Sequence, residues 1–296
     1  MPLKPIGYGF KAFLLCEAKT GYVLGWKLFT GDPRDVDEDF GLTYKIVRTL
    51  CADLTGNNNI LYTDRFYTGL QIYTDLKYLG VGACGTIQAN RAQLSEEVSS
   101  RIKQLTPNEI VYFKSKQGLL LSCWKDSSVV MMLSNCYESG TAETTRRRKR
   151  KEIEKLERER ELENASEEDP DVPDIEVKVK LNIPISIYDY NKNMSGVDLF
   201  DQKAAYYGVL LRSHRWYMKI FFRFLEVSMI NAYTIYKKVY EKYNAEPMSH
   251  LEFRKDITRD LLEEFREKLG IMSTKQKRKE SNSGIEIYRH NLKIAN

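Results

Sequence analysis

The feature that most constrains the fold is the alternation of short strand patterns with helix patterns over the first ninety residues. The expected elements are strands at 8–17 and 22–29, a helix at 42–54, a strand at 59–63, a helix at 68–79 and a strand at 83–88. A turn signal at 19–21 joins the first two strands into a hairpin, and a capping-box pattern at 68–71 opens the second helix. Such alternation predicts a mixed α/β fold.

Strand patterns alone occupy residues 109–136, where turn signals separate IVYFKSK, LLLSCWK and SVVMMLSN. This pattern predicts an antiparallel meander with Gly118 in its first turn. The composition then changes sharply at RRRKRK (146–151), which precedes a Glu-rich stretch and the acidic EEDPDVPD (167–174). Because positive charges at a helix N-terminus oppose the macrodipole, we expect the basic block to be a loop that precedes a solvated helix.

Helical patterns fill the rest of the chain. Apolar residues between Tyr206 and Tyr243 predict a long helix, and we expect Trp216 to be packed in the core. A second capping box, Ser249 to Glu252, opens another helix. No apolar run approaches the roughly 20 residues that a membrane helix needs, so we expect no membrane span.

Composition excludes several classes of protein. The 296 residues are 42% hydrophobic, which is enough for a core, and they carry a net charge of +5. The 5 cysteines are spread singly without a CxxC pair, and the 3 histidines are scattered. These patterns argue against a disulfide framework, a zinc knuckle and a His-rich metal site. A reducing compartment, cytosol or nucleus, is the default expectation.

Three carboxylates are the candidate chemical groups. Asp64 directly follows a short strand, while Asp198 and Asp201 are spaced so that a helix would bring both to one face. Carboxylates that converge from different elements are what Mg²⁺ requires, and two such ions can assist phosphoryl transfer. Structural roles remain the alternative, because Asp is common in loops after strands and at helix starts.

An ordered series of motifs extends over roughly residues 1–240. The motifs are MPLKP (1–5), GFK (9–11), TGY (20–22), LYTDRFYT (61–68), CGTIQANR (84–91), YDYNKNM (188–194), GVD (196–198), DQ (201–202), Trp216 and NAY (231–233). In order and spacing they resemble the piggyBac family of DNA transposases and their domesticated, transposable-element-derived relatives. The series is far more specific than any lone motif.

The resemblance implies an RNase H-like catalytic core, a mixed sheet flanked by helices whose acids bind two Mg²⁺ ions. It further implies that the family's second and third catalytic acids are Asp64 and Asp198, and that Asp201 is an additional acid close to the metals. The family cuts DNA and transfers strands with a TTAA target preference. The expected domains are 1–108, the first part of the core; 109–183, a β-rich insertion with a charged linker and helix; 184–245, the second part of the core with the long helix; and 246–296, a C-terminal helix and polar tail.

Departures from the family pattern predict a loss of activity. The family's first catalytic Asp lies on the opening strand of the sheet, upstream of the segment matching residues 1–5, so we expect this acid and its strand to be missing. Losing one of three ligands would remove the geometry of a two-metal mechanism. Arg65 stands where the family commonly has Asn, and its charge would compete with Mg²⁺ for Asp64. The missing strand would leave an unpaired sheet edge, through which a homo-oligomer could form.

Basic residues are the candidate DNA contacts. The block RRRKRK is a nuclear import signal, a phosphate-contacting loop, or a solvated segment balanced by the Glu-rich stretch behind it. We expect weak, non-specific DNA binding and a nuclear location. The candidate contacts are Arg65, Lys203, Arg212, Arg215 and Lys219.

The sequence leaves three functions open. The leading hypothesis is a transposable-element-derived domain that binds DNA and is catalytically incomplete. The second is a fragment of an active Mg²⁺-dependent DNA transposase of the cut-and-paste type that targets TTAA. The third is a domesticated protein-interaction module with no role in nucleic-acid binding.

Overall fold

The computed structural model describes residues 10–56, 58–149, 176–208, 213 and 215–268. The chain divides into two compact units, Met1–Thr234 and Ile235–Asn296. In the described residues, every strand belongs to the first unit, which also contains helices, whereas the second unit is helical. The mixed α/β class is therefore confirmed. No helix within the described ranges combines the length and the apolar character that crossing a membrane requires.

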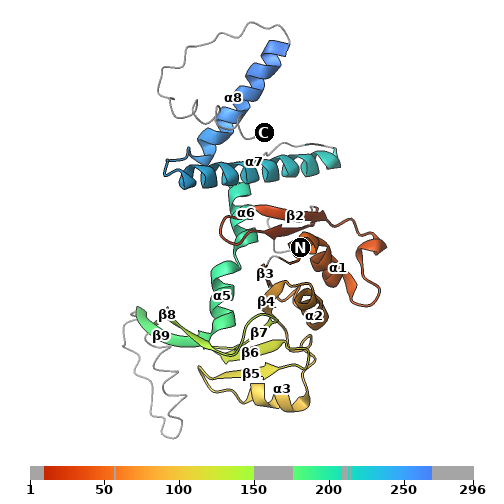
Figure 1. Ribbon diagram of the computed structural model, residues 1–296, viewed down its shortest axis with the longest axis vertical. Helices are drawn as coiled ribbons and strands as arrows, with labels where there is room; N and C mark the ends of the chain where they lie inside the picture. Colours follow the sequence, from red (N-terminus) through yellow and green to blue (C-terminus); the bar gives the residue numbers. More distant parts are fainter. Residues whose placement is uncertain (1–9, 57, 150–175, 209–212, 214, 269–296) are drawn as a thin grey trace. The chain divides into compact units, whose positions relative to one another are not determined.

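A five-stranded mixed sheet forms the centre of the first unit, in the order β3-β4-β7-β6-β5 (Figure 1). Its strands are β3 (Ile60–Thr63), β4 (Gly82–Thr86), β5 (Ile110–Lys114), β6 (Leu120–Lys125) and β7 (Val129–Ser134). Strands β3 and β4 are parallel, and the remaining neighbours are antiparallel. The expected meander is confirmed, and Gly118 in its first turn has the positive φ, 76°, that a tight hairpin needs.

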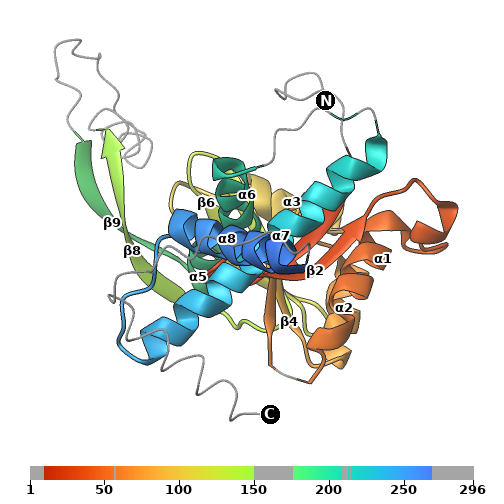
Figure 2. The ribbon, with the colours of Figure 1, turned by 90° about the horizontal axis from the view of Figure 1, so that it is seen from above.

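Alternation along the strands gives this sheet two buried faces. On β7, Leu133 packs into one core and the preceding Met132 into the other. The first core is completed by α1 (Gly41–Leu50), α2 (Leu70–Tyr78) and α3 (Glu96–Lys103). The second core contains Ile187 and Tyr190 of α5 (Ile185–Asn193). Helices α1 and α2 lie side by side (Figures 1 and 2).

The expected hairpin forms a second, separate sheet of β1 (Ala12–Cys16) and β2 (Val23–Leu28). Helices from late in the chain hold it, namely α6 (Gly196–Tyr206) and α7 (Trp216–Lys242). Asn231 of α7 both accepts a hydrogen bond from the Val23 N–H and donates one to the Val23 carbonyl, each at 2.9 Å. The side-chain amide of Asn231 thus pairs with β2 as the backbone of another strand would.

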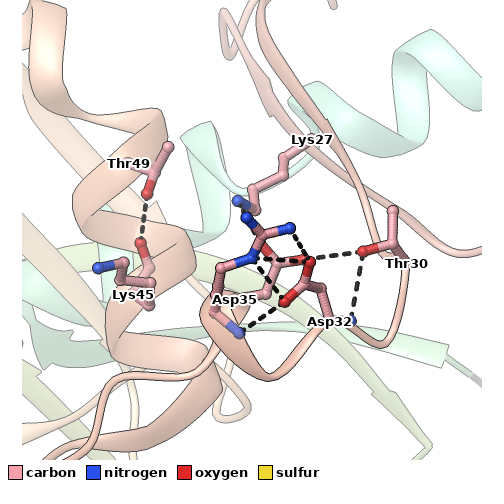
Figure 3. Close-up of polar contacts among 7 residues, drawn as sticks. Lys27, Thr30, Asp32, Asp35, Lys45 and Thr49 are labelled. Carbon is pink, nitrogen blue, oxygen red and sulfur yellow. Dashed lines mark hydrogen bonds and ion pairs between the residues drawn. The ribbon is translucent and has the colours of Figure 1, made fainter.

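Polar side chains tie the end of β2 to the short 3-10 helix η1 (Pro33–Asp35), as Figure 3 shows. The Lys27 ammonium lies 2.7 Å from the Asp35 carboxylate, and the Thr30 hydroxyl donates to the same carboxylate at 3.3 Å. Asp32 accepts a hydrogen bond from the Arg34 N–H at 2.8 Å and so caps the first turn. These contacts set the path by which the chain leaves β2 toward α1.

The basic block does not form the expected loop. Residues through Lys149 belong to β8 (Thr141–Lys149), which pairs with β9 (Glu176–Pro184) in an antiparallel two-stranded ribbon. The ribbon extends away from the five-stranded sheet in both views (Figures 1 and 2). Positive charges at the start of a helix would oppose its macrodipole, and residues 146–149 accordingly do not form a helix. This effect does not distinguish a loop from a strand, and here the segment pairs with β9. The Glu-rich helix expected after it lies outside the described residues.

The long helix expected from Tyr206 begins later. Helix α6 ends at Tyr206, and α7 starts at Trp216. Trp216 is 63% exposed and contacts Phe10, with 5.8 Å between the ring centroids, so the expectation that it is packed in the core was wrong. A single-sequence pattern does not show how much of an apolar helix surface finds a neighbour.

The second unit begins with the last turns of α7 and contains α8 (His250–Lys268). The capping box at its start is confirmed, because the Ser249 N–H donates to Glu252 at 3.0 Å and the Glu252 N–H donates to the Ser249 hydroxyl at 3.3 Å. The Tyr236 and Phe253 rings pack with 4.9 Å between their centroids. This stacking joins α7 to α8 within the unit.

The side chain of Asn135, just after β7, joins three pieces of the first unit. Its amide oxygen accepts from the Ala83 N–H at 2.6 Å, and its amide nitrogen donates to the carbonyls of Tyr73 and Val81 at 2.9 and 3.1 Å. Asn135 is only 8% exposed, so water cannot readily replace these bonds.

Replacing Asn135 with Ala should lower the free energy of unfolding by about 3 kcal/mol, because three buried backbone groups lose their partner. Urea unfolding followed by tryptophan fluorescence measures the change. The matched control is Asn182→Ala on the exposed side of β9, which should cost less than about 0.5 kcal/mol. Equal losses in both variants would contradict this account of Asn135.

Candidate functional site

Asp64 occupies a tight turn at the end of β3. Its carbonyl accepts hydrogen bonds from the N–H groups of Tyr67 and Thr68, both at 3.1 Å, and one oxygen of its carboxylate accepts from the Phe66 N–H at 2.8 Å. The residue itself is exposed. The turn therefore directs an exposed carboxylate from the end of a rigid strand, as expected from the sequence.

A buried group of hydroxyls holds that turn in place. The Thr63 hydroxyl lies 2.7 Å from the Tyr73 hydroxyl and 2.8 Å from the Thr68 hydroxyl. Burial raises the pKa of Tyr73, so its phenol stays protonated and available to this group. A Cβ on Gly85 would lie about 2.4–2.5 Å from the Thr63 carbonyl, the Thr68 hydroxyl and the Tyr73 hydroxyl, so β4 can approach only because residue 85 is glycine.

The capping box expected at 68–71 does not form. The N-cap residue of α2 is Gly69, and no side chain caps the helix. The Thr68 hydroxyl instead donates to the Asp64 carbonyl at 2.9 Å and lies in the buried hydroxyl group. Thr68 therefore stabilises the Asp64 turn rather than the helix.

Asp198 lies in the first turn of α6, and close packing of α6 against the hairpin sets its position. A Cβ on Gly196 would lie 3.0 Å from the Glu17 carbonyl, and one on Gly21 would lie 2.8 Å from the Phe200 nitrogen. Phe200, two residues after Asp198, is fully buried and packs with Val23 and Ile230. Glycine at positions 21 and 196 lets α6 approach the hairpin turn closely. This packing fixes the position of Asp198 in the first turn of α6.

A cavity of about 550 Å³ brings Asp64 and Asp198 together between the two sheets. Tyr67 and Tyr190 line it as well. Burial raises the pKa of Tyr190, and the charges of both Asp64 and Asp198 contribute to the rise. Burial and the charge of Asp64 also raise the pKa of Tyr67 to about 12. Both carboxylates therefore share the cavity with Tyr190, which the predicted site did not include, although it lies within the motif at 188–194.

The walls of this cavity are two strand edges without a partner strand. In the described part of the chain, β1 pairs with β2 alone and β3 with β4 alone, and every residue of β1 and β3 lines the cavity. Their free edges carry backbone N–H and C=O groups that a further strand could bind. The absence of the family's first strand stays a prediction, but an opening between β1 and β3 is present.

Asp201 is not among the described residues that line the cavity. Its carboxylate accepts a hydrogen bond from the Arg223 guanidinium at 2.6 Å, and that guanidinium also lies 4.6 Å from the centroid of the Phe200 ring. Burial, followed by the charge of Asp201, raises the pKa of Cys16 to about 12. Asp201 thus faces α7 and the hairpin, and its predicted proximity to a metal is not supported by any contact in the described residues.

The carboxylates present do not complete a two-metal site. Besides Asp64 and Asp198, the cavity is lined by Glu17, whose carboxylate accepts hydrogen bonds from the N–H and hydroxyl of Thr20. Within the described residues, no three His, Cys, Asp or Glu side chains gather as metal ligands. Two Mg²⁺ ions about 3.5–4 Å apart need more convergent oxygens than two carboxylates supply. The roles of Asp64, Asp198 and Asp201 as catalytic residues and metal ligands therefore stay predictions.

The five candidate DNA contacts lie in different settings. Arg65 is exposed directly beside Asp64, and Arg215 and Lys219 are exposed around the start of α7. The Lys203 ammonium instead donates to the Thr20 carbonyl at 2.6 Å, which holds α6 on the hairpin. Arg212 lies outside the described residues. Arg65, Arg215 and Lys219 are thus the candidates with exposed side chains.

Comparisons with known proteins agree with this geometry. A family model described as Transposase IS4 matches residues 1–233. PiggyBac transposable element-derived protein 5 of Homo sapiens is 20% identical over 220 residues, which are 73% of this chain and 36% of that protein. A cryo-EM structure of a piggyBac transposase synaptic complex with hairpin DNA superposes with a TM-score of 0.71 at 18% identity, covering 99% of this chain and 52% of that chain.

These matches define what the chain shares with its relatives. It spans about a third of the curated relative and about half of the solved transposase. The structural likeness confirms the RNase H-like fold class. Since the family model covers most of the chain, the chain belongs to the IS4-type transposase family, among the piggyBac transposases and the proteins derived from them.

Proposed function

We propose that this chain is a piggyBac-derived domain that binds DNA and is catalytically incomplete. The observation that carries the proposal is the cavity between β1 and β3, where Asp64 and Asp198 are present and no third free carboxylate of the described residues joins them. Such a chain keeps the fold and part of the acidic site of a transposase without the full set of metal ligands. Mg²⁺ is therefore a cofactor of the family rather than one for which the described residues provide a complete site.

The β8–β9 ribbon supports the proposed DNA binding. Its strands contain six basic and two acidic residues, which give +4 of the chain's net charge of +5. The strand register places Arg147 opposite Lys178, so both strands bring basic residues to the same part of the ribbon. A two-stranded ribbon is narrow enough to enter the major groove of DNA. The structural neighbour, a transposase bound to hairpin DNA, favours the same partner.

Replacing both Arg147 and Lys178 with Gln should weaken binding to duplex DNA of arbitrary sequence. The negative slope of log K against log salt concentration should become shallower by up to about 2, because binding releases about one counterion fewer for each phosphate contact that is lost. The free energy of unfolding should change little, because neither substitution removes a backbone hydrogen bond of the strand pair. Fluorescence anisotropy over a salt series and urea unfolding measure the two quantities.

The matched control removes two exposed charges elsewhere, through Lys114→Gln and Lys116→Gln at the β5–β6 turn. An equal loss of affinity in the control would reject the ribbon as the DNA contact. Binding of the unaltered chain that does not weaken with salt would contradict an electrostatic DNA interface and favour the protein-interaction module.

The incomplete carboxylate set predicts no metal-dependent chemistry by this chain alone. Purified protein with Mg²⁺ or Mn²⁺ and TTAA-flanked DNA should show no nicking or joining above a metal-free control, measured on a denaturing gel. Turnover that disappears in Asp198→Ala would overturn the proposal, because the described acids would then suffice.

A second candidate is a fragment of an active cut-and-paste transposase. The free edges of β1 and β3, which line the same cavity, favour it, because an extended segment that pairs with such an edge could place a carboxylate near Asp64 and Asp198. Reading the genomic sequence upstream of residue 1 for an in-frame strand with an acidic residue tests this candidate. Activity of the longer polypeptide, absent from this chain, would establish it.

A nuclear location and self-association are further parts of the proposal. The basic residues of β8 provide a candidate import signal, and a free strand edge provides a candidate surface for a homo-oligomer. Imaging of a fluorescent fusion with and without the basic block tests the first. Sedimentation equilibrium tests self-association, and a chain that stays monomeric at high concentration would argue against a homo-oligomer.

A further inference from the structure

Two cations and an exposed aromatic ring lie directly beside Asp64. The Phe66 ring is 38% exposed, and the Lys11 ammonium lies 4.9 Å from its centroid. The Arg91 guanidinium lies 6.0 Å from the same centroid. We call Lys11, Phe66 and Arg91 the Phe66 platform. It combines residues from before β1, after β3 and after β4, so the fold rather than sequence proximity assembles it.

The platform is tied rigidly to the carboxylate. Arg91 donates to the Phe66 carbonyl at 2.6 Å and to the Arg65 carbonyl at 3.2 Å, which joins the loop after β4 to the Asp64 turn. The Phe66 N–H donates to the Asp64 carboxylate at 2.8 Å. The ring of Phe66 also packs edge-on against Tyr67, with 5.0 Å between centroids. A group that binds the platform would therefore lie at a set position relative to Asp64.

The charges of this region are not neutralised. In the portion of the chain with described coordinates, Lys11, Arg65 and Arg91 are exposed and form no ion pair with an acidic side chain. Other arginines of the same unit do, such as Arg48 with Asp75 and Arg101 with Glu109. The unpaired cations Lys11 and Arg91 near the exposed Phe66 ring form a local surface that suits an anion with a flat apolar part.

We propose that the Phe66 platform binds an unpaired nucleotide of a DNA strand, with the base stacked on Phe66 and the flanking phosphates near Lys11 and Arg91. This inference rests on the proposed DNA binding. A base inside a duplex has both faces covered by its neighbours, whereas an unpaired base can use an aromatic side chain as its stacking partner. A base that stacks on Phe66 would displace Lys11 or Arg91 from the ring, and the displaced cation could then bind the phosphate of the same nucleotide.

The chemistry of the platform favours a nucleic acid over an acidic peptide. A carboxylate peptide would engage the cations but would leave the ring of Phe66 exposed, whereas a nucleotide covers both. The ring also lies next to Asp64, so the bound strand would be held where the family cuts DNA. The platform thus gives the acidic cavity a means to distinguish frayed or single-stranded DNA from an intact duplex.

The test compares two fluorescent probes on the full chain, a blunt duplex and the same duplex with a short single-stranded overhang. Phe66→Leu keeps an apolar side chain but removes the ring, so it should weaken overhang binding about tenfold and leave blunt-duplex binding unchanged. The matched control is Phe40→Leu, at an exposed phenylalanine (48%) before α1, which should change neither affinity. Lys11→Gln should weaken overhang binding and reduce its salt slope by about 1.

The outcomes separate this inference from the proposed function. If the unaltered chain binds DNA but Phe66→Leu binds the overhang equally well, the platform is rejected and DNA binding stands. If the unaltered chain binds neither probe, both are rejected. Equal weakening for both probes, or competition by an acidic peptide as strong as by single-stranded DNA, also rejects recognition of an unpaired nucleotide. Lys11→Gln covers the case in which Phe66→Leu disturbs folding, because the Lys11 side chain is exposed and donates no hydrogen bond in the described structure.

Discussion

The first unit depends on the hydrogen bonds of the buried Tyr73 hydroxyl. Through Thr63 and Thr68 it joins the end of β3 to the start of α2, in a space that exists because residue 85 has no side chain. Asp64 lies between those two threonines, so core packing determines where this exposed acid is held. The Asp64 turn takes its position from this buried group.

The elements that the sequence predicted well are those determined by local patterns. The hairpin and the meander depend on two-residue periodicity and on turns such as the one at Gly118, and both formed as expected. The capping box at Thr68 did not form because the Thr68 hydroxyl donates to the Asp64 carbonyl, four residues earlier, instead of accepting from the first turn of α2. Strand β8 was missed because its partner, β9, follows a long intervening segment, and strand pairing over such a distance leaves no local pattern.

Part of the candidate site was predictable in the same sense. The family motifs indicated that Asp64 and Asp198 belong together, and both of them line the cavity between the sheets with Tyr190. Spacing along α6 suggested that Asp201 would join them, but Arg223 of the next helix binds its carboxylate instead. An ion pair between side chains on different helices depends on how those helices pack. The spacing of residues along one helix carries no information about that packing. Tyr190 and Lys11 lie within the motifs, but only the fold shows what they contact.

The attachment of the hairpin to α7 has a consequence for how this protein is made. Asn231, which binds both backbone groups of Val23, comes 208 residues after it. At usual rates of translation the ribosome needs about 10–40 s to cover that distance. During this interval the newly made β1 and β2 lack the helices that later cover their apolar side chains, so we expect chaperones that shield exposed hydrophobic segments to bind the nascent chain.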